Sequence, residues 1–381
     1  MKNKKLVSRL GVALMLMGVV FALTLQPQEA RAQATFKLKF QASWPAGSTL
    51  FDNFKMFTEQ AKKISGGRLD IEPLPAGAVV PAFEVLDATS RGVIDGAHSW
   101  ASYWYGKRKV AVLFTGGPGG TFGMDYIDYL GWMYEGGGLK LYNEFYQDIL
   151  KLKVVVYPIL PSGPQSFGWF KKPFKNMAEL KGTKMRVGGM AGELFEKAGV
   201  RVVNLPGGEI IPAAERGVID AAEWVTPGED MKMGFQDIWK NYYLPGMHEN
   251  VTVGELLINK DVWEKFPPDL KAIVEAASMN TLMRWWVGFI KFNSQALKEL
   301  QEKHKVNIIR TPDDVLTTQL KTWDEIAKEE AAKDPFFKKV WDSQKEYAGL
   351  VVPARRFMFP PYDFAADYYW PKPKAAPKPK K

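Results

Sequence analysis

Residues 74–82 read Leu-Pro-Ala-Gly-Ala-Val-Val-Pro-Ala, and residues 205–213 read Leu-Pro-Gly-Gly-Glu-Ile-Ile-Pro-Ala. A second matching block follows each copy, because Arg-Gly-Val-Ile-Asp stands at 91–95 and again at 216–220. The paired blocks are 131 and 125 residues apart. That spacing is far longer than the repeat of a solenoid, which is about 20–50 residues. A single duplication of this kind indicates two similar lobes.

The chain before the first copy has the pattern of an α/β unit. Residues 36–42 alternate apolar and polar side chains, which is typical of a half-buried strand. Ser48 or Thr49 can then cap a helix whose apolar positions recur at helical spacing through 50–64. A second strand pattern begins at Leu69. Strand, helix and strand with short links predict an α/β lobe.

The segments after each repeat are placed to form a cleft. In each copy a proline-started helix runs to a glycine, and Val-Ile-Asp then enters a short strand. Ligands of open α/β sheets bind beyond the carboxyl ends of strands. We therefore expect residues 98–105 from the first lobe and 223–229 from the second lobe to face one another.

The second half of the chain changes to long helical patterns. One pattern begins at Pro267 and continues to Leu300, a strand pattern follows at 306–309, and further helices cover about 313–350. We expect the domains to be lobe I at 33–157, lobe II at 158–251, and a return strand to lobe I with C-terminal helices at 252–370.

Both ends of the chain differ from its body. Residues 1–32 have a basic start, a sixteen-residue apolar run and a small-x-small ending, the order of a secretory signal peptide. A membrane anchor is the alternative, but a span needs roughly twenty apolar residues. We expect cleavage before Gln33 and a periplasmic protein, without disulfides because the chain has no Cys. Residues 371–381 are rich in Pro and Lys, which predicts a disordered tail.

The charge of the body argues against nucleic-acid binding. The formal net charge is +9, but the first 32 residues and the tail after Trp370 account for the excess. Between them the chain holds 41 basic and 41 acidic residues. A nucleic-acid-binding domain needs a basic face. We expect no nucleic-acid partner.

Patterns typical of catalysis do not occur in the sequence. The chain has no Cys and three His, which leaves little for a nucleophile–base pair. Gly-x-Ser-x-Gly, His-Glu-x-x-His and P-loop motifs are missing. We expect a binding protein and not an enzyme. The alternative is a periplasmic enzyme that uses a metal-bound water with Glu223 as its base.

Four residues near the expected cleft have the chemistry to bind a small carboxylate with a cation. Arg186 ends a strand pattern before two glycines, where a guanidinium can pair with a carboxylate through two hydrogen bonds. Gln165, and Glu223 beside Trp224, supply oxygen ligands that suit a hard cation such as Na⁺ or Ca²⁺. A surface salt bridge is the alternative for Arg186. The coincidence of these residues with the cleft favours binding.

The same residues lie in stretches that resemble a known family. Residues 165–170, 185–189 and 221–225 are similar to the extracytoplasmic solute receptors of TRAP transporters, of the DctP type. So are residues 103–107 and 141–145. The resemblance covers about 35–350 and is greatest to the subgroup that binds 2-oxo and 2-hydroxy acids, such as pyruvate and lactate, through a metal ion.

This resemblance implies a periplasmic-binding-protein-like α/β fold of two lobes, with a hinge that closes on the ligand and long C-terminal helices. It implies that Arg186 pairs with the carboxylate, and that Tyr103 and Trp104 contact the ligand. Gln165, the Glu223 side chain and the Trp224 carbonyl would hold the Na⁺ or Ca²⁺ ion. The implied partners are the TRAP membrane subunits and, through exchanged C-terminal helices at 315–369, a second copy of the chain.

The chain also departs from this subgroup. Gly228 stands where the subgroup often has Tyr, so a bulkier acid could enter there. A binding protein that serves a sensor kinase, and a binder of neutral sugars that stacks on tryptophan, are the remaining alternatives.

Overall fold

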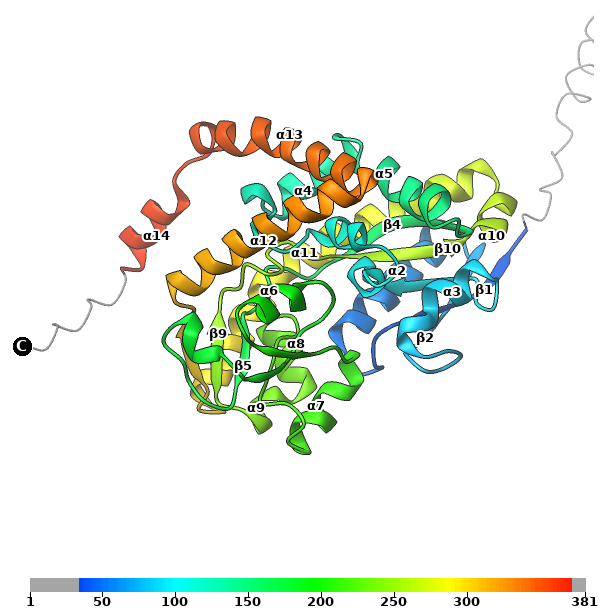
Figure 1. The fold of residues 1–381 in the computed structure, drawn as a ribbon. Coiled ribbons are helices and arrows are strands. Elements are labelled where there is room, and N and C mark those ends of the chain that lie inside the picture. The colour runs from blue at the N-terminus through cyan, green and yellow to red at the C-terminus, as the bar shows by residue number, and fades with distance from the viewer. Residues whose placement is uncertain (1–33, 372–381) are drawn as a thin grey trace, which may run out of the picture. The chain divides into compact units, whose positions relative to one another are not determined.

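The computed structural model describes residues 34–371. The predicted signal peptide at 1–32 and the tail at 372–381 lie outside the described residues. From Lys37 onward the described chain forms a single compact unit built on two β-sheets (Figure 1).

The first sheet combines strands from the beginning and the middle of the chain. Its order is β2-β1-β3-β10-β4. β3 runs parallel to β1, whereas β10 runs antiparallel to both β3 and β4. The strands are β1 (Phe36–Ala42), β2 (Leu69–Leu74), β3 (Gly96–Ser99), β4 (Val154–Pro161) and β10 (Val253–Asn259).

The second sheet has the order β11-β9-β5-β8-β6-β7. β6 is parallel to β7 and β8, and β5 is antiparallel to β8 and β9. The strand expected at 306–309 is present as β11 and pairs in parallel with β9. The strands are β5 (Gly168–Phe170), β6 (Lys184–Arg186), β7 (Arg201–Val203), β8 (Ala221–Ala222), β9 (Asn241–Leu244) and β11 (Asn307–Arg310).

Helices pack on both sheets, which confirms the predicted α/β class. Ser48 caps the first helix of the body as expected, since its hydroxyl accepts a hydrogen bond from the Leu50 N–H. Short 3-10 turns occupy Ala82–Glu84, Ala101–Trp104, Lys109–Thr115, Gly120–Gly123 and Met177–Leu180, with a π-turn at Phe145–Ile149. The α-helices are α2 (Thr49–Ile64), α3 (Val85–Ser90), α4 (Tyr126–Tyr134), α5 (Gly138–Glu144), α6 (Ala191–Lys197), α7 (Gly207–Glu215), α8 (Pro227–Met233), α9 (Phe235–Ile238), α10 (Lys260–Lys265), α11 (Pro268–Glu302), α12 (Asp313–Lys333), α13 (Pro335–Met358) and α14 (Tyr362–Tyr369).

Three segments carry the chain from one sheet to the other. The first, 162–167, links β4 to β5, and the second, 245–252, links β9 to β10. These two crossing segments are hydrogen-bonded to each other, for example from the Gln165 N–H to the Glu249 carbonyl at 3.0 Å. The third is α11, whose 35 residues pack against α2, β4 and α8 before the chain enters β11.

The two repeat copies fold alike at their ends but not at their beginnings. Each Val-Ile-Asp precedes a strand, β3 in the first copy and β8 in the second. In the first copy a 3-10 turn begins directly after Pro81. In the second copy α7 begins after Pro206, so Pro212, the counterpart of Pro81, lies inside the helix. Each copy therefore has a helical segment that begins after a proline, as expected, but the proline is Pro81 in the first copy and Pro206 in the second.

None of the helices within residues 34–371 combines the length and apolar character that crossing a membrane requires.

Candidate functional site

A small chamber lies where the ends of β3, β6 and β8 meet the two crossing segments. Its volume is about 10 Å³, which is close to the room that one water molecule needs. The residues that line it come from both halves of the repeat and from both crossing segments. They are Trp100, Ser102, Tyr103, Gln165, Arg186, Gly188, Glu223, Trp224 and Glu249.

Arg186, the last residue of β6, is the charged centre of this chamber. Its side chain is almost completely buried, with 1% of the residue exposed. The guanidinium donates from Nη1 to Glu223 Oε1 at 2.5 Å and from Nε to the Leu205 carbonyl at 3.0 Å. Its Cζ lies 5.2 Å from the centre of the Trp224 ring, within the range of a cation–π contact. These contacts hold the Arg186 guanidinium in one position at the chamber.

Glu223 follows β8 and balances the charge of Arg186. Its Oε1 also accepts a hydrogen bond from the Gly188 N–H at 2.6 Å. Burial raises the pKa of Glu223, while Arg186 and the Gly188 N–H act in the opposite direction. The ion pair is fully buried, so either partner alone would leave a costly unpaired charge.

The two crossing segments bring Gln165 and Glu249 together at the edge of the chamber. Gln165 donates from Nε2 to Glu249 Oε2 at 2.5 Å, and its own Oε1 is buried without a hydrogen-bond partner. Burial raises the pKa of Glu249 to about 8, and the nearby negative charge of Glu223 acts in the same direction. Burial and Glu223 thus favour the protonated form of Glu249 beside the charge-balanced Arg186–Glu223 pair.

One tryptophan from the segment after each repeat copy lies in the chamber. Trp100 and Trp224 lie edge to face with their ring centres 5.8 Å apart. Tyr103 packs against Trp100, and its hydroxyl is buried without a hydrogen-bond partner. The repeat therefore predicted correctly which two segments would face one another.

Trp104, which was expected to contact the ligand, lies outside the chamber lining. Its indole N–H instead donates to Glu255 Oε1 at 2.8 Å. Trp104 packs edge to face against the Tyr103 ring. It therefore supports Tyr103 and does not face the chamber itself.

Four lining residues were not named as candidate site residues from the sequence: Trp100, Ser102, Gly188 and Glu249. Ser102 lies in the segment 98–105 that was expected to face the cleft, and Gly188 is one of the two glycines noted after Arg186. Trp100 lies in the segment 98–105 that follows the first repeat copy, so its pairing with Trp224 was within reach of the repeat. Glu249 stands in the irregular segment 245–252, which has no strand or helix period to assign it a direction. Its pairing with Gln165 depends on the two crossing segments lying side by side.

The residues present fit a hard cation. An amide oxygen without a donor, on Gln165, and the carboxyl groups of Glu223 and Glu249 line the same chamber. Oxygen atoms of this kind are the ligands that Na⁺ and Ca²⁺ prefer. Among residues 34–371 there is no cluster of three or more His, Cys, Asp or Glu side chains suited to a metal, so any site here needs amide or carbonyl oxygens as well.

Gly228 does not open the chamber to a bulkier ligand. A Cβ atom at Gly228 would lie 2.1 Å from Cε1 of Phe292, so the phenylalanine of α11 already fills the space beside it. The Gly228 N–H also donates to Asn293 Oδ1 at 2.9 Å. Gly228 is thus a packing position between α8 and α11.

The model of the family 7 bacterial extracellular solute-binding proteins, DctP, matches residues 40–334. The chain belongs to this family. The family consists of transport receptors, so the chain is a solute-binding receptor and the enzyme alternative is set aside.

Individual relatives agree with this assignment. A monocarboxylate 2-oxoacid-binding periplasmic protein of Nostoc sp. is 32% identical over 309 residues, which cover 81% of this chain and 83% of that protein. A TRAP periplasmic solute-binding protein of Pseudoalteromonas atlantica T6c, solved with sodium and pyruvate, is 32% identical with a TM-score of 0.79 and covers 87% of this chain and 98% of its own.

A TRAP transporter solute-binding protein of Bordetella bronchiseptica RB50 has a TM-score of 0.82 and 29% identity, with 88% of this chain and 97% of its own covered. It was solved as a dimer with copurified calcium and picolinate in one site. These likenesses confirm the expected two-lobed fold and the receptor role of the family. Proteins of the family are periplasmic, bind small carboxylates and work with membrane subunits.

Proposed function

We propose that this chain captures a small 2-oxo or 2-hydroxy monocarboxylate together with a Na⁺ or Ca²⁺ ion in the chamber around Arg186. The observation that carries the proposal is the buried Arg186, held beside Glu223, with the unpaired Oε1 of Gln165 in the same chamber. Relatives that are 32% and 29% identical bind pyruvate with sodium and picolinate with calcium, and both ligands are small carboxylates.

The charges of the chamber explain why an anion and a cation would bind together. Arg186 is already neutralised by Glu223, so a carboxylate that enters alone adds an unbalanced buried charge. In our proposal the ligand carboxylate pairs with Arg186 while Gln165, Glu223 and the Trp224 carbonyl hold the cation. The cation supplies the balancing positive charge and a second contact to the ligand.

Capture needs the two lobes to move apart, because the chamber has room for about one water molecule. The crossing segments 162–167 and 245–252 are the proposed hinge, since they join the sheets on either side of the chamber. Closure then excludes water, which strengthens each charged contact. The closed form would be the one that the membrane subunits of a TRAP transporter accept.

The remaining features of the proposal concern the ends of the chain. Residues 1–32 would direct export and be removed before Gln33. The domain boundaries expected at 157 and 251 fall within β4 and the second crossing segment, so the lobes are proposed to divide at the crossings.

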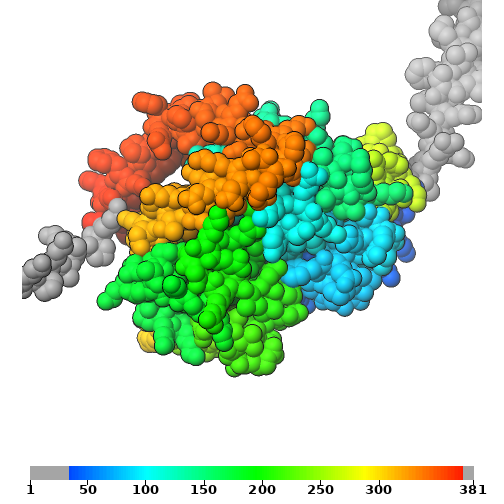
Figure 2. Space-filling view, in the orientation of Figure 1, coloured from blue at the N-terminus to red at the C-terminus, as the bar shows by residue number. Residues whose placement is uncertain are grey.

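We also propose a homodimer through the C-terminal helices. The end of α13 and all of α14 carry large exposed apolar side chains, such as Phe357 at 92%, Phe364 at 77% and Trp370 at 81% exposure. Figure 2 shows this segment, in orange to red, along one edge of the molecule. A patch of this kind marks a protein–protein contact. The Bordetella relative is a dimer.

Calorimetric titration of residues 33–381 with pyruvate tests the proposal. The protein is stripped with chelator in sodium-free buffer and titrated without cation, with Na⁺ and with Ca²⁺. We expect binding that requires a cation. In Arg186→Lys the charge remains beside Glu223 but the planar fork is lost, so binding should weaken roughly 10- to 100-fold, the value of one charge-assisted hydrogen bond.

Arg216→Lys is the matched control, because Arg216 is exposed at the end of α7 and should leave affinity unchanged. Binding that ignores cations would remove the metal from the proposal and keep Arg186. Full affinity in Arg186→Lys would refute the site.

A further inference from the structure

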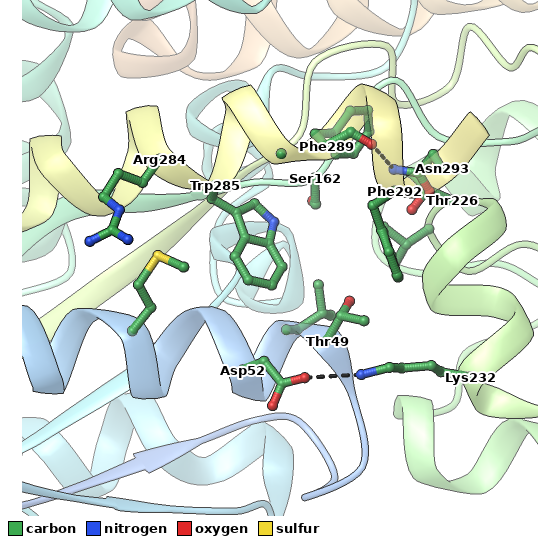
Figure 3. A pocket seen from close by; sticks show the side chains of 14 residues that line it. Thr49, Asp52, Ser162, Thr226, Lys232, Arg284, Trp285, Phe289, Phe292 and Asn293 are labelled. Atoms are coloured by element: carbon green, nitrogen blue, oxygen red, sulfur yellow. Dashed lines mark hydrogen bonds and ion pairs between the residues drawn. The ribbon is translucent and has the colours of Figure 1, made fainter. Parts of the chain in front are cut away.

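A second cavity, separate from the chamber, lies between α2, α8 and α11 (Figure 3). Its volume is about 310 Å³, which is in the range of small-molecule sites. None of its lining residues is shared with the chamber around Arg186. The cavity nevertheless lies close to it, since Val225 and Thr226 directly follow Trp224.

The walls of this cavity are mainly apolar and aromatic. Trp285, Phe289 and Phe292 line it from α11, and Leu50 and Met56 line it from α2. Figure 3 shows the Trp285 ring between α11 and α2 and the Phe292 ring beside α8. A flat or elongated hydrocarbon body would be covered on two sides by these helices.

The charged residues of the lining leave one cation unpaired. Lys232 of α8 forms an ion pair with Asp52 of α2 at 3.0 Å. Arg284 of α11 also lines the cavity, and within residues 34–371 it has no hydrogen-bond or ion-pair partner. The side chain is exposed at the cavity's edge, so its guanidinium is free to bind an anion in two-point geometry.

Gly288 keeps this cavity open. It lies in the middle of α11, where glycine weakens a helix relative to alanine. Its backbone does not need a positive φ, and a Cβ atom placed there would meet nothing within 4 Å. Neither crowding nor backbone conformation requires glycine here. Its effect is the free space between Trp285 and Phe292.

We infer that this cavity is a binding site for an amphipathic monocarboxylate, whose aromatic or aliphatic body packs on Trp285, Phe289 and Phe292 and whose carboxylate pairs with Arg284. The inference does not depend on which solute the chamber binds. It assigns the protein a second ligand, of larger apolar surface than a 2-oxo acid of three or four carbons.

Calorimetric titration with indole-3-acetate tests the inference, with neutral indole-3-acetamide as the paired probe. Residues 33–381 carrying Arg186→Lys are used alongside the unaltered sequence, so that binding in the chamber is weakened in one arm. We expect saturable binding of indole-3-acetate in both proteins. Indole-3-acetamide should bind at least about tenfold more weakly, since it cannot form the charged pair with Arg284.

Two variants locate the site. Gly288→Leu should fill the cavity and reduce the affinity for indole-3-acetate at least about tenfold. Gly349→Leu is the matched control, because Gly349 is an exposed mid-helix position of α13 whose Cβ would also meet nothing within 4 Å. Arg284→Gln should remove the preference for the acid over the amide, whereas Arg356→Gln on α13 should retain it.

Several outcomes would overturn the inference. One is the absence of saturable binding, and another is full affinity in Gly288→Leu. A third is binding that disappears in Arg186→Lys, which would mean that the probe occupies the chamber. Failure of pyruvate to bind would contradict the proposed function but would leave this inference standing, since the two probes report on different cavities.

Discussion

The hydroxyl of Tyr103 is buried in the chamber without a hydrogen-bond partner. An unpaired buried hydroxyl costs about 1–3 kcal/mol of stability, which a ligand oxygen could recover. We therefore expect Tyr103→Phe to raise the unfolding free energy of the ligand-free protein and to weaken pyruvate binding roughly 3- to 10-fold. Thermal unfolding and calorimetry measure the two effects. Tyr105→Phe is the control and should change neither quantity, because Tyr105 lies outside the chamber lining. Unchanged affinity for pyruvate in Tyr103→Phe would show that Tyr103 does not contact the ligand.

A second prediction at this scale concerns pH. Glu255 of β10 is buried, with Trp104 donating to Oε1 and Tyr142 and Tyr146 donating to Oε2. Burial raises the pKa of Glu255 from 4.5 to about 7, although the three donors act against it. A raised carboxyl pKa means that the folded state holds the proton more tightly than the unfolded state. The stabilisation is complete below about pH 4.5 and is lost as pH rises through about 7.

Glu255→Gln should remove this pH dependence. The oxygen of the glutamine amide can still accept from the Trp104 indole, and its NH₂ group can donate to the hydroxyl oxygens of Tyr142 and Tyr146. We therefore expect the fold to be retained. Urea midpoints at pH 5, 6, 7 and 8 are the measurement. We expect the unaltered protein to lose up to about 3 kcal/mol more than Glu255→Gln across this range. If the two proteins show the same pH dependence, the pKa of Glu255 is the same in the folded and unfolded states, which would contradict the prediction.

At the scale of elements, a carboxylate joins the two halves of the molecule. Glu229 of α8 is buried and accepts hydrogen bonds at the start of α2, from the Thr49 N–H at 2.7 Å and from the Ser48 hydroxyl at 2.6 Å. The same carboxylate accepts from the Trp224 indole at 3.1 Å. A negative charge at a helix N-terminus is favourable. Through Glu229, the chamber residue Trp224 is therefore linked to the start of α2 on the other sheet's side. In the proposed mechanism this link stabilises the closed form.

Glu229→Gln should weaken ligand binding without touching the ligand. The amide cannot accept from both Thr49 and Ser48, and loss of about 2 kcal/mol from the closed form corresponds to roughly 30-fold in affinity. Small-angle scattering should also show a larger radius of gyration without ligand. Glu209→Gln, exposed in the first turn of α7, is the control. Unchanged affinity and radius would mean that this contact does not govern closure.

The elements also show where the sequence was informative. Strands and helices with a clear period, such as β1, α2 and α11, were predicted near their observed positions. The repeat led to Trp224, and Arg186 followed from a strand end before two glycines. Glu249 was missed because irregular backbone gives a side chain no periodic direction. The hydrogen bond of Trp104 could not be predicted because its acceptor, Glu255 of β10, is distant in sequence.

The whole molecule leaves one apolar surface without cover. Phe357, Phe364, Tyr368 and Trp370 on the end of α13 and on α14 are each more than three-quarters exposed. Figure 1 shows α14 beyond the end of α13, and no other element within residues 34–371 packs extensively against it. Burying these rings against a second copy is favourable by roughly 25 cal/mol per Å² of apolar area. Exchange of such an element between identical chains is a common route to a dimer.

Removal of residues 359–381 should therefore give a monomer that still binds its ligand, because the chamber lies far from α14 in the chain and none of its lining residues is deleted. Light scattering after gel filtration measures the mass, and calorimetry with pyruvate measures the binding. Removal of 372–381 alone is the matched control, and it should leave the dimer intact because it keeps α14. A monomeric full-length chain, or a dimer that survives the longer deletion, would contradict the exchange. Loss of binding in the monomer would instead mean that the partner completes the site.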